Sequence, residues 1–373
     1  MKEIVIIANK YAPNTAVTNR LLSFVTAFSK MGVQVTLFFV RPDNNRSLLT
    51  DEFQHVSVHH LWQNSPHNKI LSYIKSFYDI KSIRKSLAGK NVLLLGAEAY
   101  LTILSKNKSI KLYHERTEHP EVVPWPIFLS RKSYYMACRD IAGLFVISTA
   151  LKRHFCDKGC NEEKVHIINM TVDSSRFSSL SKTNEKDKYI AYCGTASNNK
   201  DGVDELIKSF AIVKRSHPEF KLLIIGKALS KKDSSGNLQL IAALGLQDSV
   251  QITGIIPASK IPQLLKDAEI LALDRPYSLQ TQCGFPTKLG EYLLTGNPVV
   301  LTRVGDIPLF LKDGESALIA EERNAQDFAL KLIWAIENPE EAKKIGKVGA
   351  LVARQHFDSM IEAEKILKIM KLS

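Results

Sequence analysis

The 373-residue sequence has no long apolar run and no pattern among its cysteines. A helix that crosses a bilayer needs roughly 18 consecutive apolar residues, and no segment approaches that length. The run 3–8 is too short for the core of a signal peptide and is better read as a first strand. The five cysteines are odd in number and irregularly spaced, which predicts a protein of the reducing cytoplasm.

The sequence also has few features of metal or nucleic-acid binding. Cys156 and Cys160 have no second pair, and no Asp-x-Asp pair occurs, so we expect no metal site. The absence of an arginine-rich arm and of an aromatic-basic RNA motif argues against nucleic acid as a partner. The formal charge of +12 and the pI near 9.3 favour an anionic partner, such as a phosphorylated substrate or a membrane face, although basicity is often only a matter of solubility.

The length exceeds the size at which one hydrophobic core usually stops growing, so we expect two domains. Short β-branched runs alternate with amphipathic stretches, and strands are predicted at 3–8, 33–40, 92–96, 111–115, 144–148, 189–194, 222–226, 250–254, 269–274 and 299–302. The polar stretch 173–188 has almost nothing to bury and is the predicted linker. The pattern predicts an α/β fold of two doubly wound, Rossmann-like domains, 1–172 and 189–356, with a ligand site in the cleft between them.

One motif places polar residues at the start of a short apolar helix, "GFPTKLGEYLLTGNPVV" (284–300). Pro286 suits the N1 position, and Thr287 and Lys288 follow in the first turn. A helix N-terminus beside a lysine is suited to phosphate. Glu291 would repel phosphate, so we expect it to bind a ribose diol. Taken alone, the segment is explained better by a capped helix with an ion pair between Lys288 and Glu291.

A second motif, "YCGTASNNKDGVDELIKSF" (192–210), shifts the balance from a merely capped helix towards a phosphate site. It reads as a strand, a glycine turn and a helix start. Gly194 permits a close backbone approach, and Lys200 can reach a diphosphate from the side opposite to Lys288. Two strand-to-helix turns with one lysine each predict a diphosphate clamp that needs no metal.

Together these motifs resemble the nucleotide-sugar glycosyltransferases of the GT-B fold, specifically glycosyltransferase family 4, over nearly the whole chain. Gly194 and Lys200 match the family's Gly-Arg…Lys phosphate motif, with Thr195 at the arginine position. Glu291 matches the second glutamate of its Glu-x7-Glu motif, which binds ribose, and Cys283 replaces the first, which contacts the donor sugar. The form "GFPTKLGEYL" is similar to a subset of bacterial surface-polysaccharide transferases.

The resemblance implies transfer of a sugar from a nucleoside-diphosphate sugar to a hydroxyl of a glycan or lipid-linked saccharide, with retention and without metal or another cofactor. It implies that the segment 357–373 packs back on the first domain. The implied nucleotide-binding residues are Gly194, Thr195, Lys200, Ile255, Thr287, Lys288, Leu289 and Glu291. The implied donor-sugar residues are Gln282, Cys283, Gly284 and Phe285. The implied catalytic residues are His114, Lys200 and Lys288.

The first domain carries a crowded segment, "LYHERTEHPE" (112–121), after a predicted strand. The family places a histidine near the sugar here, which suggests His114, in a segment that should open into the cleft. Its neighbours Glu115 and Arg116 would lie on the acceptor side, or would form a solvated salt-bridge network. In the loop "YAPNTAVTNRLLSF" (11–24), Asn19 and Arg20 would reach donor phosphate or acceptor, or would only cap and solubilise a helix.

The stretch 68–90 has six Lys or Arg against one Asp, with apolar residues near one face. This is typical of a helix on the anionic inner face of a cell membrane, and equally of a domain helix whose lysines face solvent. Two other functions stay open. A sugar-nucleotide epimerase on the same fold would use the crowded 114–119 segment, and a non-catalytic nucleotide-sugar-binding subunit would fit Thr195 and Cys283.

Overall fold

A computed structural model gives the fold of residues 2–12, 15–41, 53–61, 69–123, 129–183 and 188–372, with residues 69–73 described by their backbone alone. The chain divides into two compact units. The first unit contains Met1–Thr171 and Ser359–Ser373, and the second contains Val172–Asp358. The last helix of the chain therefore belongs to the same unit as the first strand.

The first unit is built on a seven-stranded sheet in the order β3-β2-β1-β4-β5-β6-β7, and all of its strand pairs are parallel. Its strands are β1 (Glu3–Ala8), β2 (Gln34–Phe39), β3 (Val56–His60), β4 (Asn91–Leu95), β5 (Lys111–Arg116), β6 (Gly143–Val146) and β7 (Val165–Ile167). Its helices are α1 (Ala16–Lys30), α2 (Lys69–Ile83), α3 (Glu98–Leu104), α4 (Arg131–Asp140), α5 (Thr149–Asp157) and α16 (Ser359–Ile369), with a 3-10 turn at Glu162–Lys164.

The second unit repeats this plan with a six-stranded parallel sheet in the order β10-β9-β8-β11-β12-β13. Its strands are β8 (Tyr189–Cys193), β9 (Lys221–Ile225), β10 (Val250–Ile252), β11 (Ile270–Leu273), β12 (Val299–Thr302) and β13 (Leu318–Ala320). Its helices are α6 (Ser175–Ser178), α7 (Asn198–Asp201), α8 (Val203–Ser216), α9 (Lys231–Ala243), α10 (Ile261–Asp267), α11 (Leu279–Cys283), α12 (Lys288–Leu294), α13 (Ile307–Phe310), α14 (Ala325–Glu337) and α15 (Pro339–His356), with a 3-10 turn at Ala258–Lys260.

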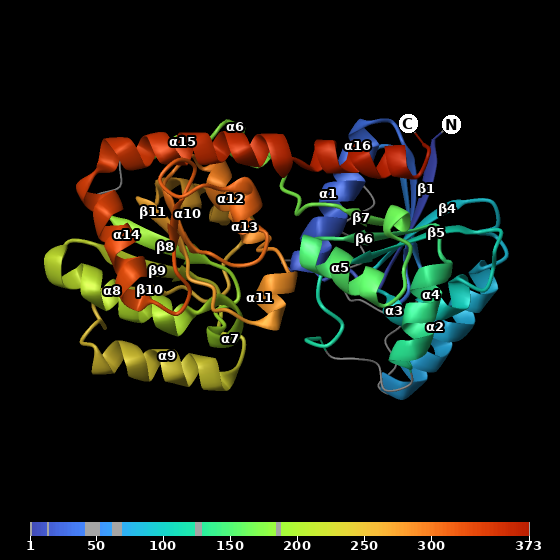
Figure 1. The fold of residues 1–373 in the computed structure, drawn as a ribbon, viewed down its shortest axis with the longest axis horizontal. Helices are drawn as coiled ribbons and strands as arrows, with labels where there is room; N and C mark the ends of the chain where they lie inside the picture. The colour runs from blue at the N-terminus through green and yellow to red at the C-terminus, as the bar shows by residue number, and fades with distance from the viewer. Residues whose placement is uncertain are drawn as a thin grey trace. The chain divides into compact units, whose positions relative to one another are not determined.

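Helices cover both faces of the second sheet, with α8 and α9 on one side and α12 and α15 on the other (Figure 1). Strands covered on both faces are apolar along their whole length, and all five residues of β8 and all four of β11 are buried. The chain builds one half of each sheet, returns to its centre and builds the other half. The strand order therefore reverses between β1 and β4 and between β8 and β11, and in such folds ligands bind at the carboxyl ends of these strands.

Helix α16 completes the core of the first unit by packing against α1. Its buried residues include Ile366 and Leu367, which belong to the same apolar cluster as Phe24 and Phe28 of α1. The buried Glu362 fixes the helix to the chain beyond β7, because its carboxylate accepts from the backbone N–H of Asn169 at 2.9 Å and from its Nδ2 at 3.0 Å. Apolar packing and a pair of buried hydrogen bonds thus hold the segment in place.

The predicted strands are found within one or two residues of their expected bounds. Three strands were missed, because β7 and β13 have three residues each and the histidine-rich β3 lacks a continuous apolar run. The predicted linker stretch 173–188 does have something to bury. Its described part, residues 173–183 and 188, contains the short helix α6, whose Phe177 is buried, and belongs to the second unit.

We predict that Ile366→Ala destabilises the first unit by about 2–5 kcal/mol, because it leaves a cavity in a fully buried site. The matched control is Ile361→Ala on the same helix, where the isoleucine is exposed. Urea denaturation followed by circular dichroism measures both. If the two substitutions lower the unfolding midpoint equally, α16 is not part of the core.

Candidate functional site

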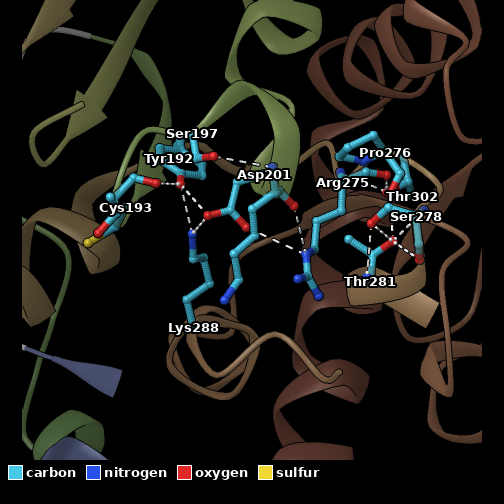
Figure 2. Close-up of polar contacts among 12 residues, drawn as sticks. Tyr192, Cys193, Ser197, Asp201, Arg275, Pro276, Ser278, Thr281, Lys288 and Thr302 are labelled. Atoms are coloured by element: carbon cyan, nitrogen blue, oxygen red, sulfur yellow. Dashed lines mark hydrogen bonds and ion pairs between the residues drawn. The ribbon is translucent and has the colours of Figure 1, made fainter. Parts of the chain in front are cut away.

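Polar side chains converge at the carboxyl ends of β8 and β11, where the strand order of the second sheet reverses (Figure 2). Tyr192 comes from β8, Asp201 from α7, Arg275 from the loop after β11, and Lys288 from the start of α12. Nζ of Lys288 lies 2.8 Å from Oδ2 of Asp201 and 2.8 Å from the hydroxyl of Tyr192. It also lies 4.3 Å from the centre of the Tyr192 ring, in cation–π contact.

Gly194 allows Lys288 to lie against the backbone at the end of β8. Its φ is +150°, and a Cβ added there would be 2.4 Å from Nζ of Lys288. In the structure the group that lies close to this glycine is the lysine, and the approach of a phosphate to its backbone stays a prediction. The N–H of Gly194 donates to the carbonyl of Ile225 at 2.8 Å, so it continues the sheet.

Asp201 lies between two cations. Its Oδ2 accepts from Lys288, and its Oδ1 lies 3.5 Å from Nε of Arg275. Burial alone would raise the pKa of Asp201, but the charges of Lys288 and Arg275 outweigh it and hold this pKa below its usual value. Burial lowers the pKa of Lys288, and Asp201 opposes that effect. Two cations and one carboxylate leave the cluster with a net positive charge.

Local backbone geometry fixes Asp201 and Arg275. Gly202 ends α7 with a φ of +60°, and a Cβ there would lie 1.9 Å from the carbonyl oxygen of Asp274, so glycine is required. Thr302 of β12 holds the Arg275 backbone on both sides, since its Oγ1 accepts from the N–H at 2.9 Å and donates to the carbonyl at 2.8 Å. The site is thus built on the ends of rigid strands.

Asp274, the last residue before Arg275, is 3% exposed and its Oδ2 has no hydrogen-bond partner among the described residues. Burial raises its pKa to about 8, with a further contribution from Glu205 and Asp204. A carboxyl group with this pKa is mostly protonated at neutral pH. It therefore adds no full negative charge to the positive cluster.

The predicted clamp of two lysines differs in detail from the structure. Lys200 lies on α7 and contributes its carbonyl oxygen, which accepts from Nε of Arg275 at 3.3 Å. The side chain that contacts Lys288 belongs to the next residue, Asp201. Sequence reasoning missed both Asp201 and Arg275. Asp201 could have been found from its place in the Lys-Asp-Gly turn. For Arg275, the sequence offers only a charged residue that follows a buried strand.

Glu291 pairs with Arg176 of α6, and Lys288 pairs with Asp201, so the ion pair between Lys288 and Glu291 is not formed. Helix α12 begins at Lys288 with Thr287 as N-cap, so Pro286 is not at N1. The structure contradicts the prediction that Leu289 binds the nucleotide. Its side chain is fully buried and its N–H donates to the carbonyl of Pro286 at 3.1 Å.

The four residues expected at the donor sugar occupy different environments. Gln282 is half-buried on α11, and the backbone N–H of Gly284 donates to the carbonyl of Gln280 at 2.9 Å. Cys283 is buried, and burial raises its thiol pKa. Phe285 belongs to the core, because its ring packs against Phe310 and Phe357 at centroid distances of 5.7 and 5.4 Å. The structure therefore contradicts a sugar contact by the Phe285 ring.

Two of the nucleotide-binding predictions fall on exposed turns of the second unit. Thr195 follows β8, is exposed, and its carbonyl accepts from the Tyr192 hydroxyl at 2.9 Å. Ile255 follows β10 and is 70% exposed. Strand β10 lies at the edge of the sheet, two strands from β8. The two turns follow the carboxyl ends of their strands, as the prediction required.

His114 is fully buried in β5, which contradicts its predicted place in an open segment. Its Nδ1 lies 3.1 Å from the carbonyl of Leu94, and its Nε2 lies 3.1 Å from the hydroxyl of Tyr134. Burial lowers its pKa to about 4, while Glu98 raises it and Arg116 lowers it further. The histidine is therefore neutral, and both of its ring nitrogens are engaged within the core.

Arg20 and Glu115 form a buried ion pair, with Nη2 of Arg20 at 2.8 Å from Oε1 of Glu115. Arg20 also donates to the carbonyls of Ile168 and Asn169, at 3.1 and 2.7 Å. These contacts tie α1 to β5 and to the chain just beyond β7, so the predicted place of Arg20 and Glu115 on the acceptor side is wrong. Asn19 is exposed on α1.

Arg116 pairs with Glu98 of α3 and donates through Nε to the carbonyl of Glu118 at 2.7 Å. The crowded segment is therefore a salt-bridge network, one of its two predicted interpretations, although it is buried. His119, which the sequence analysis did not place in a site, lies three residues past the end of β5. Its Nε2 is 3.0 Å from Nδ1 of His154, and the Nε2 of His154 is 2.9 Å from the Tyr135 hydroxyl.

The described residues lack two kinds of feature. They contain no group of three or more His, Cys, Asp or Glu side chains placed to hold a metal ion. Across the same residues, no helix has both the length and the apolar composition that crossing a membrane requires.

Comparison with known proteins relates the second unit to an enzyme family. The family described as "Glycosyl transferases group 1" matches residues 174–369, more than half of the chain. Mannosylfructose-phosphate synthase from Agrobacterium fabrum is 23% identical over 229 residues, which cover 58% of this chain and 49% of the relative. The amylovoran biosynthesis glycosyltransferase AmsK from Erwinia amylovora is 23% identical over 231 residues, 61% of this chain and 56% of the relative. The chain thus spans about half the length of the curated relatives it matches.

Solved structures resemble the whole chain. HepE from Anabaena, solved in complex with UDP, superposes with a TM-score of 0.77 at 17% identity and full coverage of both chains. Sucrose-phosphate synthase from Thermosynechococcus elongatus superposes with a TM-score of 0.76 at 14% identity, over 100% of this chain and 98% of the other. At these identities the likeness concerns the fold alone. The predicted α/β fold with two doubly wound units is confirmed, and it is the GT-B fold.

We predict that the free energy of unfolding falls as the pH drops from about 6.5 to about 4. In that range the unfolded chain binds a proton at His114 and the folded chain does not, so the loss totals about 3 kcal/mol for this residue. His114→Gln, which cannot be protonated, should make this dependence shallower. Urea denaturation at pH 7, 6 and 5 measures both proteins, and equal slopes would contradict the assignment.

Proposed function

Because the chain belongs to group 1 of the glycosyl transferases, we propose that it moves a sugar from a nucleoside-diphosphate sugar to a hydroxyl of a glycan or lipid-linked saccharide during assembly of a surface polysaccharide. The names of two relatives support the pathway, since AmsK is an amylovoran biosynthesis glycosyltransferase and WcaL of Salmonella typhimurium a putative colanic acid biosynthesis glycosyltransferase. HepE bound to UDP supports a nucleotide as part of the donor.

The observation that carries the proposal is the positive cluster at the switch point of the second sheet. Lys288 and Arg275 meet there around one carboxylate, at the strand ends where doubly wound folds bind ligands. A diphosphate carries more than one negative charge and would complement the net positive charge of the cluster. Glu291, three residues beyond Lys288, would receive the ribose hydroxyls after exchanging its pairing with Arg176.

The chemistry follows from the charge that develops in the reaction. The bond between the anomeric carbon and the diphosphate oxygen breaks, and a bond from that carbon to the acceptor oxygen forms. The leaving diphosphate gains negative charge and takes up the proton of the acceptor hydroxyl. Lys288 stabilises that charge, and a well-placed group of this kind contributes on the order of 3 kcal/mol. Retention of configuration is part of the proposal.

We propose that the reaction needs no metal ion, because Lys288 and Arg275 supply the positive charge at the phosphates. Among the residues placed by the structure, these two cations come from separate segments and meet within one cluster. A cation bound by carboxylates would require Asp201 to exchange its partners. Activity should therefore persist after treatment with a chelator.

Because a lipid-linked acceptor would lie in a membrane, the proposal includes contact between α2 and an anionic membrane. Ile74 and Tyr78 are 49% and 67% exposed one turn apart, beside the lysines at 75 and 81, while Ile80 on the inner face is buried. An exposed apolar pair flanked by lysines suits the interface of a membrane that contains anionic lipids. Ile70 and Tyr73, two of the apolar residues near one face of the stretch 68–90, lie outside the described side chains.

We predict that Lys288→Ala weakens the binding of one nucleoside diphosphate and lowers turnover by about 100-fold or more, far more than it destabilises the fold, because Asp201 keeps Arg275 as a cationic partner. Calorimetry with UDP, GDP, ADP and dTDP in the absence of metal identifies the base. UDP is the first choice, because HepE was solved with it. Normal binding by the variant would contradict the donor site.

For Glu291→Ala, we predict a larger loss of nucleotide affinity than for Arg176→Ala. The two substitutions break the same ion pair, but only the first removes the group proposed to bind ribose. Calorimetry with the bound nucleotide compares them. Equal effects would show that Glu291 acts only through its ion pair.

In a flotation assay, we predict that the protein binds vesicles containing anionic lipids and that salt weakens this binding. Replacement of both Ile74 and Tyr78 by serine should reduce binding. Leu238→Ser, at a leucine of the second unit that is 56% exposed, is the control and should have no effect. Absence of salt-sensitive binding by the parent protein would contradict the proposed contact with a membrane.

A further inference from the structure

Asp201 contacts Lys288, Tyr192 and Arg275 in the cluster that Figure 2 shows. Its Oδ2 lies 2.8 Å from Nζ of Lys288 and 2.9 Å from the hydroxyl of Tyr192, and its Oδ1 lies 3.5 Å from Nε of Arg275. The residue is 5% exposed. A single carboxylate thus connects β8, the loop after β11 and α12.

Lys288 depends on that contact because it is buried. Its side chain is 15% exposed, and the neighbouring Tyr192 and Cys193 are neutral, since burial holds both of their pKa values above the usual range, that of Cys193 at about 12. Arg275 repels the ammonium, and Glu291 on the same helix is paired with Arg176. The negative charge in contact with Lys288 is therefore that of Asp201.

We propose that Asp201 is a positioning residue, which keeps the ammonium of Lys288 charged and fixed at the carboxyl end of β8 so that a diphosphate finds a prepared site. The inference rests on the donor site proposed above and assigns a role to the carboxylate at its centre. Once the diphosphate is bound, its oxygens share the lysine with Asp201.

A carboxylate beside a phosphate site has a second conceivable effect, which is repulsion of the ligand. The geometry argues against it as the main role. Both oxygens of Asp201 face cations, and the cluster keeps a net positive charge after the carboxylate is counted. Asp201→Asn would remove the repulsion, but it would also leave a buried lysine with burial and Arg275 both lowering its pKa.

The test compares Asp201→Asn with Tyr192→Phe, which removes a neutral neighbour of Lys288 and leaves its charged partner. One measurement needs no nucleotide. The ammonium of Lys288 is titrated by NMR in protein with ¹³C-labelled lysine, and its signal is assigned with Lys288→Arg. We expect Asp201→Asn to shift this titration to lower pH, while Tyr192→Phe leaves it near that of the parent.

The second measurement is the affinity for UDP, or for the diphosphate that binds best, by calorimetry between pH 7 and pH 9. In Asp201→Asn the affinity should fall about tenfold per pH unit above the lowered pKa of Lys288, because binding then requires protonation of the lysine. The parent should hold its affinity to higher pH. Circular dichroism establishes that the variants are folded.

The outcomes separate the two proposals. An unchanged Lys288 titration in Asp201→Asn, or tighter nucleotide binding at every pH, overturns the role of Asp201. If no nucleotide binds to the parent, the proposed function fails, and the titration still decides whether Asp201 keeps Lys288 charged. If Asp201→Asn does not fold, Asp201→Glu replaces it. That variant retains the charge and displaces it by one methylene, so we expect an unchanged titration with weaker binding, and unchanged binding overturns the proposal.

Discussion

A buried lysine needs a negative partner, and in this protein the contact between Lys288 and Asp201 determines how the second unit is built around its strand ends. Removing an ammonium from water is costly unless a charge and hydrogen bonds compensate for it. Asp201 supplies the charge, the Tyr192 hydroxyl accepts a hydrogen bond, and the absence of a side chain at Gly194 leaves the space. The left-handed Gly202 then allows α8 to follow Asp201 without a clash with Asp274, the residue after β11.

This contact lies where it does because of the sheet topology. The strand order reverses between β8 and β11, so the chains that leave these two strands diverge and their carboxyl ends stay uncovered by a direct connection. Residues far apart in sequence, such as Asp201 and Lys288, meet there on rigid supports. The first unit has the same topology, and there the buried charges of Arg20 and Glu115 neutralise each other and tie helix to sheet.

Much of this architecture was predictable from the sequence. Continuous apolar runs such as those of β1 and β8, rich in β-branched or aromatic residues, are typical of strands covered on both faces, and Gly194 and Lys288 were recognisable by their place beside strand ends. The partner of Lys288 was not predictable, since an i,i+3 glutamate is a local alternative that only the fold excludes. The prediction for His114 was wrong for a related reason. A histidine inside a strand reads as polar, yet two buried hydrogen bonds place it in the core.

The measurement that tests the account most directly is a crystal structure of the protein with the nucleoside diphosphate that binds it best. The account predicts that the diphosphate lies at the carboxyl ends of β8 and β11, with phosphate oxygens within hydrogen-bonding distance of Nζ of Lys288. A nucleotide bound elsewhere in the molecule, with Lys288 still contacting only Asp201 and Tyr192, would contradict it.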